Sequence, residues 1–152
     1  MTGMTLIVKT VTRLVAAFIT IFGVYIVLYG HVSPGGGFVG GVVLASGLVL
    51  VVLAFGREYA TSIVGERSAA VWDAVGALAF LAVALMGYLA WHGGGDVFFY
   101  NLLYKGDPGR LLSGGTIALS NMAIGLKVGA CIFAVFLVLV GFKSATRREV
   151  GS

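Results

Sequence analysis

Four long apolar runs constrain this chain more than any other feature of its sequence. They cover about residues 6–29, 37–55, 69–91 and 118–142. Crossing about 30 Å of hydrocarbon at 1.5 Å per residue takes roughly 20 apolar residues in a helix, and each run reaches or approaches that length. The alternating pattern of a transmembrane β-barrel is not seen. The runs predict an all-α integral membrane protein, with four transmembrane helices in a single membrane domain over residues 1–152.

Composition argues against a water-soluble globule. Only 11% of the residues are charged and 59% are hydrophobic, whereas a soluble domain is about 25% charged. The first run begins with basic residues, as a secretory signal peptide does. Its length and the lack of a small-residue cleavage site before Gly30 favour an uncleaved helix instead.

The distribution of basic residues predicts the orientation of the chain, because Lys and Arg near helix ends are retained on the cytoplasmic side. With four spans, both termini share a side with the loop between the second and third helices. The opposite side holds Lys105 and Arg110, in a glycine-rich loop over residues 92–116. We therefore expect cytoplasmic termini and an outer glycine-rich loop between helices three and four. The basic residues on the expected cytoplasmic side are Lys9, Arg13, Arg57, Arg67, Lys143, Arg147 and Arg148.

Several classes of function are disfavoured by what the sequence lacks. The net charge of +4 follows from membrane orientation, and no platform of basic and aromatic residues suited to nucleic acid is present. His31 and His92 have no Cys or Glu at metal-ligand spacing. Paired carboxylates and a nucleophile elbow are also missing. We predict no catalytic residue, metal or cofactor, and hence not an enzyme.

The junction between the first two runs, 30-GHVSPGGGFVGGVV-43, predicts a tight reversal of the chain. Pro34 disfavours helix at Ser33, and the glycines after it relax the backbone. The second helix is expected to begin at Gly36 or Gly37. Free amides at that start would suit an anion, but no GxxxxGK[ST] motif follows.

The spacing of the glycines favours helix packing over ligand binding. Glycines four residues apart expose a strip of backbone that lets helices approach closely where lipid supplies no hydrophobic drive. This spacing occurs in the second and the fourth runs. The predicted packing residues are Gly36, Gly37, Gly40, Gly41, Gly125 and Gly129.

Lys127 gives the sharpest chemical signal. It lies about nine residues, or roughly 14 Å, inside the outer end of the fourth run, where an ammonium needs a partner or water. Asp73 is the one acid within an apolar run, and counting from the cytoplasmic side separates the two in depth by roughly 16 Å. On that count they do not pair, and the partner of Lys127 is another subunit or a chain of water.

Lys127, His31 and Asp73 are therefore candidates for an ion or proton relay. Each has a structural alternative. Lys127 would otherwise donate hydrogen bonds to backbone carbonyls, and Asp73 would lie at the membrane interface. A histidine can exchange protons near physiological pH, yet a lone loop histidine most often has no such role.

The run 30-GHVSPGGGFVGGVVLA-45 resembles the signature of the MnhB family, the B-type component of Mrp-type, also called Mnh-type, multisubunit sodium/proton antiporters. The basic start KTVTRLV at 9–15 and SNMAIGLKVGA at 120–130 agree with it. The resemblance implies a small subunit that packs among the other Mrp-type antiporter subunits, while larger subunits translocate protons. Sodium ions and protons are then handled by the whole complex.

The resulting prediction is a multi-pass subunit in the lipid bilayer of the cytoplasmic membrane, which supports cation/proton exchange and complex assembly. One alternative is a purely structural subunit that closes the complex. Another is a related subunit of a proton-pumping membrane-bound hydrogenase or oxidoreductase.

Overall fold

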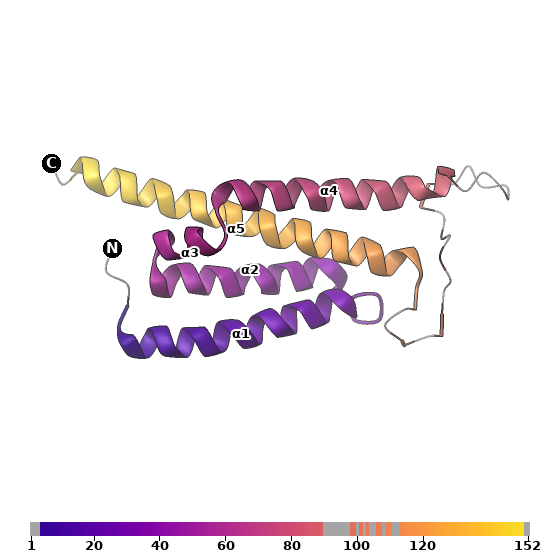
Figure 1. Cartoon of the computed structure of the whole chain (residues 1–152), viewed down its shortest axis with the longest axis horizontal. Helices are drawn as coiled ribbons and strands as arrows, with labels where there is room; N and C mark the ends of the chain where they lie inside the picture. Colours follow the sequence, from indigo (N-terminus) through magenta and orange to yellow (C-terminus); the bar gives the residue numbers. More distant parts are fainter. Residues whose placement is uncertain are drawn as a thin grey trace.

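A computed structural model of the chain describes residues 4–89, 98–99, 101, 103, 106–107, 109–110 and 113–150, with the side chains of residues 89 and 143–150 excepted. The described part is helical and contains no strand. Its helices are α1 (Leu6–Leu28), α2 (Gly36–Phe55), α3 (Arg57–Ile63), α4 (Glu66–Leu89) and α5 (Thr116–Val150) (Figure 1).

Four of these helices are long and apolar enough to cross a membrane. The candidate spans are Leu6–Leu28, Gly36–Phe55, Glu66–Tyr88 and Thr116–Phe142. They agree with the four predicted runs to within three residues at each end, so the predicted all-α fold with four spans is confirmed. The predicted glycine-rich loop, residues 92–116, lies largely outside the described residues.

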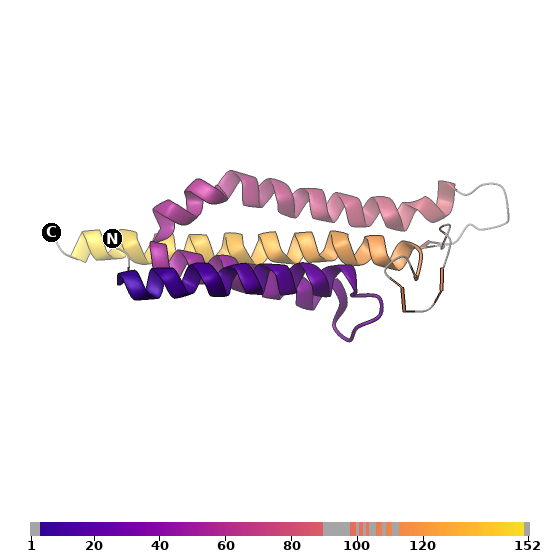
Figure 2. The ribbon, with the colours of Figure 1, turned by 60° about the horizontal axis from the view of Figure 1, so that its bottom comes forward.

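The long helices lie side by side in a row, in the order α1, α2, α5, α4. α2 packs along α1 and along α5, and α5 also packs along α4. Figures 1 and 2 show α1 and α4 at opposite edges of this row. α1 begins and α5 ends at the same end of the molecule (Figure 1). We call this the terminal end, and the opposite end, which holds the turn over residues 29–35, the junction end.

A row of helices leaves much apolar surface uncovered. Phe18 on α1, Leu78 on α4 and Phe142 on α5 are 66%, 65% and 69% exposed. Such extensive apolar surface would drive aggregation in water and is suited to lipid or to partner helices. The four spans and this surface together identify a membrane protein.

The most buried cluster lies at the terminal end, where α3 closes against the row. Phe133 and Leu137 of α5 are 1% and 0% exposed. They pack with residues of α2, α3 and α4, namely Val52, Ala60 and Ala69. α3 was not predicted from the sequence. It follows α2 after Gly56, whose φ of 93° lies in the left-handed region that favours glycine.

α5 is longer than the apolar run that predicts it. It has 35 residues, or about 52 Å at 1.5 Å per residue. The predicted boundary at Phe142 marks the end of the apolar sequence but not of the helix. Residues 143–150 are mostly polar and contain no Gly or Pro, so nothing in them stops a helix.

Candidate functional site

Lys127 and Asp73 form an ion pair between α5 and α4. Lys127 Nζ donates to Asp73 Oδ1 at 2.7 Å. The two side chains are 44% and 34% exposed, respectively. Gly76, one turn from Asp73, allows the helices to meet here, because a Cβ at Gly76 would lie 2.8 Å from Lys127 N. α4 and α5 thus bring both charges together within the candidate spans.

The prediction that Lys127 and Asp73 cannot pair is wrong. It measured depth from the terminal-end limits of the two apolar runs, as if they were level. The contact with Gly76 places Lys127 level with a residue only three positions from Asp73, which is about 5 Å along the helix axis. The long lysine side chain spans that offset. The expected partner on another subunit is therefore not needed to neutralise Lys127.

Glycines on α2 and α5 let these two helices approach until their backbones nearly touch. A Cβ at Gly37 would lie 2.1 Å from the carbonyl oxygen of Asn121, and one at Gly41 would lie 2.7 Å from that of Gly125. On the other side, a Cβ at Gly129 would lie 3.4 Å from Gly41 O. A side chain at Gly37 or Gly41 would therefore force the helices apart.

α2 and α5 also contact α1, through the side chain of Val27 on α1. A Cβ at Gly40 would lie 2.5 Å from Val27 Cγ2, and one at Gly125 would lie 2.7 Å from the same atom. Val27 thus fills the space that these two glycines leave. The three helices meet at this point near the junction end.

The turn before α2 depends on glycine and on a side chain from α5. Gly35 and Gly36 have φ angles of 109° and 55°, which favour glycine. Gly37 N donates to Asn121 Oδ1 at 3.2 Å. Asn121 thereby satisfies one of the backbone amides that a helix start leaves free. The geometry accounts for this amide without an anion.

His31 ties the turn over residues 29–35 to the segment before α5. Its Nε2 lies 3.0 Å from Arg110 O and 3.0 Å from Ser113 Oγ. A carbonyl oxygen only accepts, so the contact with Arg110 requires the proton on Nε2. Ser113 Oγ itself donates to Arg110 O at 2.6 Å. These contacts hold the two segments together at the junction end.

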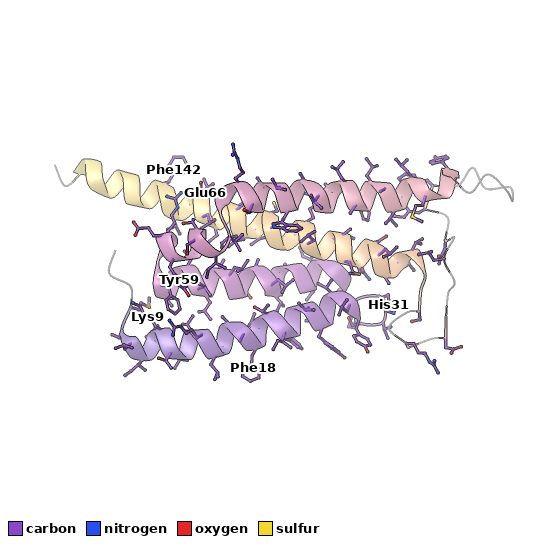
Figure 3. All side chains as sticks on the ribbon, viewed as in Figure 1. Lys9, Phe18, His31, Tyr59, Glu66 and Phe142 are labelled. Atoms are coloured by element: carbon purple, nitrogen blue, oxygen red, sulfur yellow. The ribbon has the colours of Figure 1, made fainter. Side chains whose placement is uncertain are left out.

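His31 is remote from the Lys127–Asp73 pair. Figure 3 shows His31 at the junction end, opposite Lys9, Tyr59 and Glu66. Lys127 lies eleven residues after Thr116, the first residue of α5, or about 16 Å along the helix. The structure thus joins two of the three relay candidates and leaves the third at another depth.

Asn101 has a role that sequence reasoning missed. Its Oδ1 accepts from Thr116 N at 3.1 Å, and its Nδ2 donates to Gly114 O at 3.2 Å. It therefore caps the start of α5 from fifteen residues away. A capping Asn is readily recognised only when it is adjacent to its helix, so the sequence carried no usable signal for this contact.

Replacing His31 with alanine should loosen the segment before α5. The lost hydrogen bonds are worth about 1 kcal/mol, or roughly a fivefold larger open population. Trypsin cleaves after Arg110, so we expect cleavage there to be about fivefold faster, since the rate follows the open population. The cleavage rate is measured by gel electrophoresis of vesicles whose junction end is accessible to trypsin. His31→Gln, which keeps an amide donor, serves as the control, and equal rates for all three proteins would contradict the assignment.

Comparison with known proteins gives a consistent result. Residues 7–134 match a family described as a domain related to the MnhB subunit of Na+/H+ antiporter. The B-type component of a Na(+)/H(+) antiporter from Bacillus subtilis (strain 168) is 50% identical over 50 residues, which is 33% of this chain and 35% of that protein. An uncharacterized protein of Methanocaldococcus jannaschii is 31% identical over 128 residues, 80% of this chain and 47% of that protein. The matched regions span less than half the length of either relative.

Proposed function

Because the chain belongs to the family of domains related to the MnhB subunit of Na+/H+ antiporters, we propose that it is a membrane subunit of a heteromeric sodium/proton antiporter. The family match carries this proposal. It extends over residues 7–134 and so includes the second and third candidate spans, all but the first residue of the first span, and most of the fourth. The matched relative in Bacillus subtilis is itself called an antiporter subunit.

The proposed location is the cytoplasmic membrane, with both termini on the cytoplasmic side. The shared position of the start of α1 and the end of α5 supports a common side for the termini. The excess of Lys and Arg in the loops of that end supports the cytoplasm as that side. The turn over residues 29–35 then faces outward.

Within such a complex, this chain is an accessory to transport and has no catalytic site of its own. The Lys127–Asp73 pair supplies two oppositely charged side chains within the membrane spans. Proton relays in transporters commonly use such intramembrane groups. His31 is a separate candidate at the outer surface. The principal partners are the other antiporter subunits, with sodium ions and protons handled by the assembly.

The test is to express the whole set of antiporter subunits with and without this chain, in cells that lack their own sodium/proton exchange. We expect the chain to purify with the other subunits, and omission to abolish sodium-dependent proton movement in everted vesicles. Full exchange without the chain, together with no co-purification, would overturn the proposal. Co-purification with metal-centre subunits would assign the chain to a hydrogenase or oxidoreductase instead.

A purely structural role is the second candidate, and the close α2–α5 contact favours it. A subunit whose helices meet backbone to backbone at Gly37 and Gly41 is suited to hold neighbours in a fixed geometry. In that case, omission of the chain would prevent assembly. Variants of the Lys127–Asp73 pair that still assemble would then keep full exchange.

A further inference from the structure

The Lys127–Asp73 pair is open on one side of the helix row. Lys127 lies about 16 Å from the start of α5. Asp73 lies about 10 Å from the start of α4, seven residues after Glu66. The pair therefore lies inside the two candidate spans, and both side chains are more than a third exposed.

The pair has unused hydrogen-bonding capacity. An ammonium has three donors and a carboxylate has two accepting oxygens. Among the described residues, the contact from Lys127 Nζ to Asp73 Oδ1 is the one side-chain hydrogen bond recorded for either group. Hydrocarbon offers neither donors nor acceptors, so unpaired polar groups in it are costly. Lipid tails are accordingly a poor occupant for this position.

The surface next to the pair is small and apolar. On α4, Ala70 and Ala77 flank Asp73 on its exposed side, whereas Ala69 and Gly76 on its other side are buried. On α5, the exposed residues Cys131, Val135 and Val138 follow Lys127 at four, eight and eleven residues, which places them on one helix face. We call this surface the pair face, formed by Ala70, Asp73, Ala77, Lys127, Cys131, Val135 and Val138.

α3 does not cover the pair face. It packs on Phe133 and Leu137, which follow Lys127 at six and ten residues and so point to another side of α5. The α4 and α5 sides of the pair face are brought together by the contact between Gly76 and the Lys127 backbone. Alanines beside that contact leave room for a further helix to approach closely.

We propose that a transmembrane helix of another subunit lies on the pair face and presents a neutral hydrogen-bonding side chain, Asn, Gln, Ser or Thr, to Lys127 and Asp73. Lys127 and Asp73 already neutralise each other, so an additional charge would be left without a counter-ion. An amide or hydroxyl can accept from the ammonium and donate to the carboxylate at once. This inference depends on the proposed function, because it requires a heteromeric complex.

The experiment places the photoreactive residue p-benzoylphenylalanine at Cys131, and separately at Val135, in the intact complex. After illumination we expect a band shifted by the mass of one other subunit. Mass spectrometry of the crosslinked peptide should find a transmembrane segment with a neutral polar residue within one helical turn. The comparison is the same probe at Leu78, which is 65% exposed and follows Gly76 by two residues, so that it lies on the side of α4 away from α5. Because Cys131 and Val135 are both exposed, at least one of these variants should fold.

The other outcomes each overturn the inference. Crosslinks to lipid alone, with the complex otherwise intact, would leave the antiporter proposal standing and remove the partner helix. Crosslinks to a second copy of this chain, or to a segment whose nearest polar residue is charged, would contradict the stated partner. If no subunit purifies with the chain at all, the proposed function fails instead.

Discussion

Replacing Gly37 with alanine should remove most of the assembled subunit from the membrane. The added Cβ would lie 2.1 Å from Asn121 O and 2.9 Å from Asn121 Cα, and a backbone cannot move aside as a flexible side chain can. Overpacking of this kind typically costs about 1–3 kcal/mol, or roughly a 5- to 150-fold change in an equilibrium constant. Immunoblots of membranes and native gels of the complex measure the loss.

Gly65→Ala is the matched control for this prediction. Gly65 lies between α3 and α4, where the nearest atoms to an added Cβ are 3.7 Å away. Both variants add one methyl group, so only the surroundings differ. We expect Gly65→Ala to assemble normally. Normal assembly of Gly37→Ala would contradict a close contact between α2 and α5 at Gly37.

Changes to the Lys127–Asp73 pair should separate a relay from a structural ion pair. Lys127→Met leaves Asp73 unpaired, and Asp73→Asn leaves Lys127 unpaired, so each single variant should assemble poorly. The double variant removes both charges and should recover assembly. Positioned proton donors typically alter rates by about 100-fold or more, so a relay predicts at least a tenfold loss of exchange in the recovered double variant.

Exchange per assembled complex in everted vesicles is the decisive measurement. Full exchange in the double variant would reject a relay and leave the structural role. Neutralising Arg57 and Glu66 together gives a control, because these residues also form an ion pair, at the terminal end of the row. Their side chains are 39% and 51% exposed, and pairs that reach the surface contribute little. We expect that control to keep both assembly and exchange.

The length of the apolar runs was enough to predict the four long helices. Each span is a long run with few polar interruptions, and in hydrocarbon such a run must satisfy its backbone as a helix. α3 was missed because its seven residues, REYATSI, lack an apolar run. The end of α5 was missed for a related reason. Hydropathy detects the boundary of the membrane, whereas a helix continues until its backbone is stopped.

The predicted relation between Lys127 and Asp73 failed because sequence counting assumes that helix ends are level. The contact between Gly76 and Lys127 shows how α4 and α5 are shifted along each other, and no local sequence pattern encodes that shift. The contacts of His31 and Asn101 were equally hidden. Each joins residues far apart in sequence, and nothing in the local pattern of either residue names its partner.

A row of four helices has two broad surfaces and no lumen. Since α1 and α4 lie at opposite edges (Figure 2), the four long helices described here in a row do not enclose a conduit among themselves. A passage that reaches Lys127 from the pair face therefore needs another wall from outside these four helices, which the proposed partner helix would supply. Proton or sodium movement past Lys127 would then occur at an interface between two subunits. The distance between those subunits would determine whether the passage is open or closed.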